Sequence, residues 1–250
     1  MFSVVIIARN ESDYIEACIQ SALRVSDDVV LIDSGSTDDT VDIARKCGAR
    51  IYEPGWMGYG GNKNFGNAKA INDWIISIDG DEIISEELVH SLKGFKPQLG
   101  TVYQLNSMVN YAGSWIKHSG WYPRWKHRIF NRRECQWNDA PVHEDLIPLH
   151  DKKVEQIKGD LLHYSYKSVS EHRSKVIEYA RLKATKSIRL KKSPSLAKRY
   201  LGAYFNFIKT YFIRAGFLDG KAGWTIARMD AMMVKEELKA YDSLVQIPPA

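Results

Sequence analysis

Two aspartates separated by a single glycine stand at the end of a short apolar run. Residues 74–78 are mostly apolar and rich in isoleucine, which predicts a buried strand, and Asp79, Gly80 and Asp81 follow it directly. Carboxylate oxygens are the ligands that Mg²⁺ and Mn²⁺ prefer, and glycine lets the backbone approach a ligand closely. An isolated Asp-x-Asp is more often a plain acidic turn, so the interpretation depends on its surroundings.

Polar side chains also follow the two strands predicted earlier in the chain. The first apolar strand ends at Ala8 and is followed by Glu11, and the second ends at Asp33. Short strands and helices alternate here, a pattern typical of an α/β fold with a mainly parallel central sheet flanked by helices. Ligands of such sheets bind at the carboxyl ends of the strands, so these groups and residues 79–81 are expected along one edge.

Two segments between the predicted strands carry further signals. Ser36, followed three residues later by Asp39, resembles a capping box that begins the next helix. Residues 53–64 are too rich in glycine for regular structure, and a short helix is predicted to begin near Phe65. Lys63 is then expected near the N terminus of that helix, where free backbone N–H groups favour a phosphate, with a solvated lysine as the alternative.

The middle of the chain, residues 106–140, mixes tryptophan and tyrosine with arginine. Aromatic rings stack on sugars or bases, and the arginine guanidinium binds phosphate with two parallel hydrogen bonds. Arg124 and Arg128 are therefore candidates to contact a phosphate or an acceptor, while ordinary packing would explain many of the aromatic residues.

Four titratable residues further along are candidates for chemistry. His143, Glu144 and Asp145 are consecutive within an apolar frame, and a carboxylate here could act as a general base, although surface roles are more common. His163 lies near the end of another predicted strand. It is a candidate metal ligand or phosphate partner, and a hydrogen-bonded core histidine is the alternative.

Positive charge is concentrated in the last third of the chain. The net charge is +5 overall, but residues 1–166 carry −5 and residues 167–250 carry +10. The latter segment is helical in type from Ser168, with a break at residues 193–195, and mixes aromatic with basic residues. Such helices are typical of an anionic membrane surface, and packing on the catalytic domain or in a homo-oligomer is the alternative. We therefore predict a catalytic domain, residues 1–166, and a helical extension, residues 167–250.

Other features argue against several classes of protein. No run of about 18 apolar residues is present, and no leader precedes the first strand, so a cytoplasmic chain without a transmembrane helix is expected. The three cysteines lie far apart without metal-ligand spacing and are expected to be reduced. The glycine pattern of a nicotinamide-binding fold does not follow the first strand, and a Walker A phosphate loop is absent.

Several motifs taken together resemble a known family. The sequence resembles the nucleotide-sugar domain of family 2 glycosyltransferases, which has the Rossmann-like GT-A fold. Three motifs carry this resemblance: VVIIARNE at 4–11, DSGSTD at 33–38 and DGDE at 79–82. The family's bacterial lipopolysaccharide core β-1,4-glucosyltransferase branch is resembled by GYGGNKN at 58–64, PVHE at 141–144, LHY at 162–164 and RAGFLDG at 214–220. The resemblance covers nearly the whole chain.

The resemblance implies a role for each matching position. Nucleotide-sugar contacts are implied for Ala8, Glu11, Asp33, Lys63, Asp79 and Gly80. The implied ligands of a Mg²⁺ or Mn²⁺ ion that bridges the diphosphate are Asp81 and Asp79, with His163 as a further candidate. Relatives draw their general base from an acidic pair that matches Glu144 and Asp145. His143 lies beside that pair and, like Arg124 and Arg128, is a candidate contact for the acceptor or a phosphate.

The expected function is inverting transfer of a hexose, glucose, from a UDP-sugar to a lipid-linked glycan such as the lipopolysaccharide inner core. The chain is expected as a peripheral protein on the inner face of the cytoplasmic membrane, without a nucleic-acid partner. An enzymatic alternative uses a polyprenyl phosphate, capsule or protein acceptor. The alternative from another class is a non-catalytic protein that binds nucleotides or nucleic acid through its basic tail.

Overall fold

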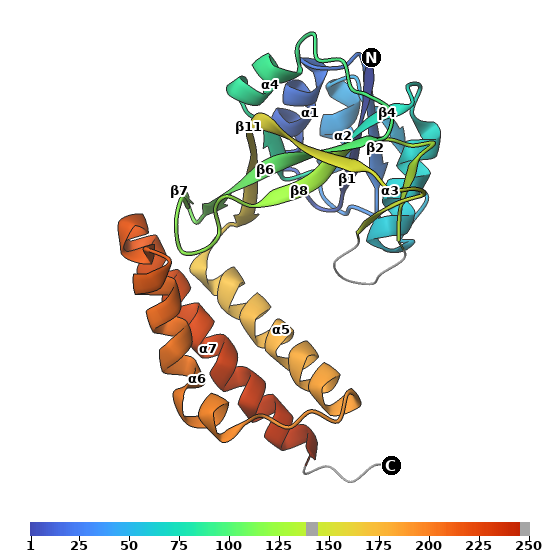
Figure 1. Ribbon diagram of the computed structural model, residues 1–250. Coiled ribbons are helices and arrows are strands. Elements are labelled where there is room, and N and C mark those ends of the chain that lie inside the picture. Colours follow the sequence, from blue (N-terminus) through green and yellow to red (C-terminus); the bar gives the residue numbers. More distant parts are fainter. Residues whose placement is uncertain (139–144, 246–250) are drawn as a thin grey trace. The chain divides into compact units, whose positions relative to one another are not determined.

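The computed structural model describes residues 1–138 and 145–245, which form two compact units (Figure 1). The first unit contains Met1–Met108 and Arg124–Tyr164, and the second contains Val109–Pro123 and the chain from Ser165 onward. The sequence predicted a single division after residue 166. The structure differs because the segment 109–123 groups with the C-terminal helices.

The described residues form one nine-stranded sheet and one two-stranded sheet. The strands are β1 (Phe2–Ala8), β2 (Asp28–Asp33), β3 (Arg50–Tyr52), β4 (Trp74–Asp79), β5 (Glu82–Ile84), β6 (Thr101–Tyr111), β7 (Ser114–Trp115), β8 (Trp125–Asn131), β9 (Cys135–Trp137), β10 (Leu146–Pro148) and β11 (Lys153–Tyr166). The large sheet has the order β3-β2-β1-β4-β8-β6-β11-β5, with β7 paired to β6, and β9 pairs with β10. Strands β3, β2, β1 and β4 are parallel, and β8 is antiparallel to β4 and β6. This confirms the α/β fold with a parallel centre.

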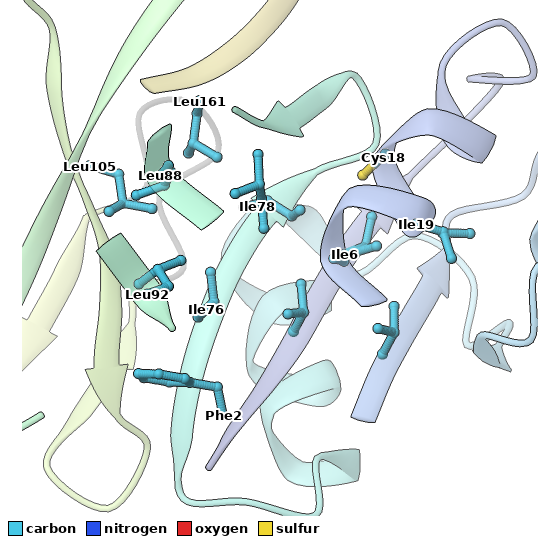
Figure 2. Close-up of a cluster of buried hydrophobic side chains, with 14 of the residues drawn as sticks. Phe2, Ile6, Cys18, Ile19, Ile76, Ile78, Leu88, Leu92, Leu105 and Leu161 are labelled. Carbon is cyan, nitrogen blue, oxygen red and sulfur yellow. The ribbon is translucent and has the colours of Figure 1, made fainter. Parts of the chain in front are cut away.

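Helices cover both faces of the first unit's sheet because residues along its central strands alternate between two cores. Val4 and Ile6 of β1 belong to one core, and Val5 and Ile7 belong to the other. The first core also receives apolar side chains from three helices, and Figure 2 shows Ile6 and Cys18 within it. These helices are α1 (Ile15–Leu23), α2 (Thr40–Lys46) and α4 (Glu86–Leu92), and α3 (Gly58–Lys69) packs on the other face.

Helix α3 begins within the segment that the sequence predicted to be an irregular loop. Its glycines allow close packing: a Cβ atom on Gly66 would lie 2.4 Å from Val5 Cγ1, and one on Gly60 would lie 1.8 Å from the Asn138 carbonyl oxygen. The prediction was wrong because tertiary packing outweighs the poor helix propensity of glycine here. Lys63 consequently lies inside the helix and not at its N terminus.

The capping box predicted before α2 is absent from the described hydrogen bonds. Asp39 precedes the helix without a side-chain cap bond, and the Ser36 hydroxyl donates instead to Asp33. Asp38 serves the helix start, because its Oδ1 accepts from the Thr40 N–H at 3.1 Å. The loop is therefore organised around two other aspartates.

The second unit is a helical assembly, as the sequence predicted. Its elements are α5 (Val169–Arg189), α6 (Leu196–Ile208), the π-helical turn η1 (Lys209–Ile213), the 3₁₀ turn η2 (Gly216–Asp219) and α7 (Gly220–Val245). The hydroxyls of Ser168 and Ser195 cap α5 and α6, and α7 packs against both helices. Asp219 joins the segment 109–123 to this unit by accepting hydrogen bonds from the Lys117 and His118 N–H groups and the Ser119 hydroxyl. None of the described helices is long and apolar enough to cross a membrane.

An aromatic cluster around His172 stabilises the second unit. The His172 ring is buried, and its Nδ1 lies 3.0 Å from the Tyr111 hydroxyl oxygen. Trp121 and Tyr166 also pack against this imidazole. Burial, followed by the charge of Lys175, lowers the pKa of His172 to about 4.

We predict that Gly66→Ala destabilises the protein through overpacking between α3 and the sheet. The added methyl group must displace Val5 or Ile32, at a cost of about 1–3 kcal/mol. Gly61→Ala is the matched control, because its Cβ would contact Met57 Cβ alone, at 3.0 Å. Urea unfolding of both variants measures the difference, and equal free energies of unfolding would contradict the packing argument.

We also predict that His172 makes the protein less stable in mild acid. An unfolded histidine binds a proton near pH 6.5, whereas the pKa of folded His172 is about 4, so the unfolded chain binds more protons between these values. Stability should therefore fall as pH drops from about 6.5 to 4, by on the order of 3 kcal/mol.

Replacing the buried imidazole should weaken this acid dependence. Thermal or urea unfolding of His172→Gln across that range should show a shallower slope than the unmodified protein. His90→Gln, which changes an exposed histidine, should keep the original slope. A His172→Gln slope equal to that of the unmodified protein would contradict the assignment.

Candidate active site

The carboxyl ends of three parallel strands meet at one edge of the sheet. In the strand register Ala8 lies opposite Asp33, and Ile7 lies opposite Asp79. The Ser34 N–H donates to the Ala8 carbonyl oxygen at 2.9 Å, which links the first two strand ends directly. The sequence expectation that these groups share an edge is therefore confirmed.

Gly80 turns the chain tightly against β1. Its N–H donates to the Ile7 carbonyl oxygen at 2.9 Å, and a Cβ atom at this position would lie 2.8 Å from the Ala8 Cβ. The Asp79 N–H donates to Glu82 Oε2 at 3.1 Å. The turn that carries Asp79 and Asp81 is thus held from both sides.

The Asp79 carboxylate lies between two cationic side chains. Arg128 Nη2 donates to Asp79 Oδ2 at 2.8 Å, and Lys63 Nζ lies 3.4 Å from Asp79 Oδ1. Burial alone would raise the pKa of Asp79, but Arg128 and then Lys63 outweigh it and hold the pKa well below its usual range. Asp79 Oδ1 is buried and accepts no hydrogen bond within the described part of the chain. Asp79 therefore stays ionised, with one carboxylate oxygen paired with Arg128 and the other with Lys63.

Glu82 is the fully buried carboxylate beneath this turn. Its Oε1 accepts from Arg128 Nη2 at 2.8 Å and from Lys126 Nζ at 2.9 Å. Burial would raise its pKa, but these two cations lower the pKa of Glu82 to about 2. Glu82 and Arg128 thus form a buried ion pair next to Asp79. The contact of Arg128 with an acceptor or a phosphate, which the sequence predicted, stays a prediction.

Asp81 faces His163 across the sheet. β11 pairs with β5 so that His163 lies opposite Glu82, and the Tyr164 N–H donates to the Asp81 carbonyl oxygen at 3.0 Å. His163 Nε2 lies 3.1 Å from Asp81 Oδ2. His163 Nδ1 is buried without a hydrogen bond among residues 1–138 and 145–245, and Glu82 Oε1 is 3.8 Å away. Two residues 82 positions apart are thereby brought together.

The carboxylate oxygens of Asp81 suit Mg²⁺ or Mn²⁺, whereas the imidazole nitrogen of His163 suits a transition metal and not Mg²⁺. In the described part of the chain, no group of three or more His, Cys, Asp or Glu residues could enclose a metal ion. A cation here would therefore take Asp81 and His163 and complete its coordination with substrate oxygens and water, as Mg²⁺ commonly does.

Asp33 shapes the loop beside the first strand. Its Oδ2 accepts from the Gly35 and Ser36 N–H groups at 2.9 and 2.8 Å. The Glu11 N–H donates to the Thr40 hydroxyl at 2.8 Å, which ties the end of the β1 segment to the start of α2. Asp33 and Glu11 therefore lie at the same edge of the sheet, in segments fixed by hydrogen bonds. Their contacts with a nucleotide remain predictions.

The predicted acidic pair is described in part. Glu144 and His143 lie outside the described residues. Asp145 is exposed. Its carbonyl oxygen accepts from the Asn138 N–H, and its own N–H donates to Asn138 Oδ1, each at 3.1 Å. Burial lowers the pKa of His127, and the negative charge of Asp145 opposes that shift. The Asp145 carboxylate therefore interacts electrostatically with His127, the β8 residue that precedes Arg128.

Arg124 is exposed, and its N–H donates to Asn106 Oδ1 at 2.7 Å. Its predicted contact with a phosphate or an acceptor also remains a prediction. Arg124 therefore differs from Arg128, whose guanidinium is buried.

Sequence reasoning missed several side chains that build this site. Lys63 Nζ lies over the Trp137 ring at 4.6 Å, so this aromatic residue packs on the cation that neutralises Asp79. Asn62 is fully buried and bridges Met57 and Ser34 by side-chain hydrogen bonds. The sequence signal for Asn62 was a polar residue at an inward-facing position of a glycine-rich helix. The missed residues are Asn62, Glu82, Lys126, His127 and Trp137.

We predict that Arg128→Met strongly destabilises the protein. It would leave the carboxylates of Asp79 and Glu82 with less compensating charge, and breaking a buried ion pair costs about 3–5 kcal/mol. Arg124→Met, at an exposed arginine four residues earlier, should change stability by less than about 0.5 kcal/mol. Urea unfolding at pH 7 measures both, and similar losses in the two variants would refute the role of Arg128.

Comparison with known proteins is consistent with this geometry. LpsC of Rhizobium meliloti (strain 1021), a lipopolysaccharide core biosynthesis glycosyltransferase, is 27% identical over an alignment 263 positions long. The alignment covers 95% of this chain and 94% of LpsC. An uncharacterized glycosyltransferase of Rickettsia prowazekii (strain Madrid E) is 29% identical over 234 residues, which cover 89% of this chain and 80% of that protein.

A solved structure of glucosyl-3-phosphoglycerate synthase from Mycobacterium tuberculosis, in complex with Mn²⁺ and UDP-glucose, is 27% identical over 44% of each chain, with a TM-score of 0.36. The family model described as glycosyl transferase family 2 matches residues 3–145, more than half of the chain. The protein therefore belongs to glycosyl transferase family 2.

Proposed function

We propose that this glycosyltransferase moves a hexose, with inversion, from a UDP-sugar to a hydroxyl group of a lipid-linked glycan, and that it requires Mg²⁺ or Mn²⁺. The observation that carries the proposal is the 3.1 Å pairing of Asp81 with His163 on the turn that also presents Asp79. This turn lies at the carboxyl edge of the parallel strands, where α/β folds bind nucleotides.

The available donors fit a divalent cation shared with a diphosphate. Asp81 and His163 would hold it, and Asp79 lies two residues before Asp81 on the same turn, with its Oδ1 3.4 Å from Lys63 Nζ. A cation bound there supplies charge stabilisation for the diphosphate leaving group. Arg128 and Lys63 keep Asp79 ionised, so the turn carries a charged carboxylate beside Asp81.

The acidic pair supplies the base in this proposal. As the acceptor oxygen bonds to the anomeric carbon, the bond from that carbon to the diphosphate breaks, and the hydroxyl proton passes to Glu144 or Asp145. A single displacement of this kind inverts the anomeric centre without a covalent intermediate on the protein. The Asn138 hydrogen bonds hold the backbone of Asp145 in position.

The acceptor class rests on the relative that matches most of the chain. LpsC carries a lipopolysaccharide core name and aligns with 95% of this sequence, which includes the C-terminal helices. A match of that extent supports an acceptor of similar chemistry, a glycan joined to lipid. The proposal of glucose and UDP rests on the motif resemblance alone.

We predict that UDP binding depends on a divalent cation and on Asp81. Calorimetric titration of UDP in Mn²⁺ should give a dissociation constant that rises at least about tenfold in Asp81→Asn, because a charged metal ligand is lost. His163→Gln should act in the same direction, and Asp42→Asn, at an exposed position of α2, should have no effect.

Variants of the acidic pair separate binding from chemistry. Glu144→Gln combined with Asp145→Asn should retain Mn²⁺-dependent UDP binding but lose sugar transfer. Equal UDP affinity in chelator and in Mn²⁺, or unchanged affinity in Asp81→Asn, would contradict the proposed metal site. Full transfer by the double variant would contradict the proposed base.

A further inference from the structure

Helix α6 exposes a continuous apolar surface, although it lies in the middle of the C-terminal helical unit. None of its residues is buried, and side chains four positions apart form a row along it: Leu196, Tyr200, Tyr204 and Ile208. Tyr200 is 73% exposed and Tyr204 is 70% exposed. We call the following residues the α6–η1 face: Leu196, Tyr200, Leu201, Tyr204, Phe205, Ile208, Phe212 and Ile213.

The charged side chains of α6 point to the opposite side, toward α7. Lys198 Nζ lies 2.6 Å from Glu237 Oε1, and Arg199 forms a double ion pair with Asp242. A Cβ atom on Gly202 would lie 3.1 Å from Val234 Cγ1, so the two helices approach closely there. Figure 1 shows α6 and α7 side by side along this contact. The cations of α6 are thus used in packing, and its outer side is left apolar.

An exposed apolar surface of this extent marks a binding site for an apolar partner. Its composition fits the boundary between water and lipid. Tyrosine and phenylalanine rings alternate with leucine and isoleucine, and the hydroxyl groups of Tyr200 and Tyr204 can stay at the level of lipid headgroups while the rings are buried.

The charge of the surrounding chain distinguishes between two candidate partners for this face, a second copy of the chain and an anionic lipid surface. Residues 167–250 carry a net charge of +10, and Arg189, Lys191 and Lys192 are exposed immediately before α6 begins. A second copy docked through this face would bring two strongly positive segments together, which is unfavourable. An anionic lipid surface instead attracts each nearby cation. The charge therefore favours lipid.

We propose that the α6–η1 face inserts into the headgroup region of an anionic lipid monolayer, with the basic segment 189–192 held against the lipid headgroups. The contact is peripheral, because an amphipathic helix of this kind lies in the plane of the interface. The inference goes beyond the proposed sugar transfer and stands on the second unit alone.

Sedimentation of the full chain with lipid vesicles tests the proposal. Binding to vesicles that contain phosphatidylglycerol should exceed binding to pure phosphatidylcholine vesicles and should fall with added salt. Leu201→Ser combined with Phe205→Ser should weaken it at least about tenfold through lost apolar burial. Ile71→Ser combined with Leu99→Ser is the matched control, because these exposed apolar residues lie in the first unit and should leave binding unchanged.

A charge-reversal variant tests the electrostatic part separately. Lys191→Glu combined with Lys192→Glu should reduce binding to anionic vesicles and leave the thermal unfolding midpoint unchanged. Vesicle binding equal to that of the unmodified protein in the Leu201 and Phe205 double variant would overturn the proposal. A dimer in analytical ultracentrifugation that this variant converts to monomer, with vesicle binding unaffected, would assign the face to a second copy instead.

The same variants keep this proposal distinguishable from the proposed reaction. Leu201→Ser combined with Phe205→Ser should retain Mn²⁺-dependent UDP binding, because the face lies outside the unit that holds Asp81 and His163. Loss of vesicle binding with intact UDP binding supports the membrane face by itself. Failure of UDP binding in the unmodified protein would instead count against the transfer reaction alone.

Discussion

The ion pairs of Arg128 are the interaction on which the site depends. One buried guanidinium group donates both to Asp79, at the end of the central strand, and to Glu82, at the start of the next strand. Together with Lys63 and Lys126, it keeps both carboxylates charged in an apolar interior, where burying an unpaired charge is costly. The turn between them, including Asp81, keeps its shape because both of its ends are bound to the same side chain.

Much of this arrangement could be predicted from the sequence because local signals and parallel topology agree. Runs of isoleucine and valine predicted β1, β2 and β4, and polar residues after each strand predicted a common edge. Asp81 and His163 were each predicted as candidate metal ligands, but their direct contact was not predicted, because the residues lie far apart in the chain. Their contact requires the antiparallel register of β5 and β11.

The remaining features depend on contacts that a linear pattern does not contain. Glu82 looked like one more acid in an acidic turn, and its burial follows from Arg128, 46 positions later. The first part of α3 was predicted to be a loop because glycine has poor helix propensity, yet Gly60 is needed where the helix approaches the Asn138 carbonyl oxygen. The segment 109–123 joins the helical unit through Asp219, which is about 100 residues away. The basic residues of α6, which the sequence analysis related to an anionic membrane surface, include Lys198 and Arg199, and these are paired with acidic residues of α7.

The low pKa values in the Arg128 network have a consequence for enzyme kinetics. The pKa of Asp79 is held well below its usual range, the pKa of Glu82 is about 2, and the pKa of Arg128 is raised by the same two carboxylates despite its burial. These three groups therefore keep one ionisation state throughout the neutral range. A pH–rate profile measured between pH 5 and 9, as ordinary buffers allow, would therefore report on other groups, the general base among them.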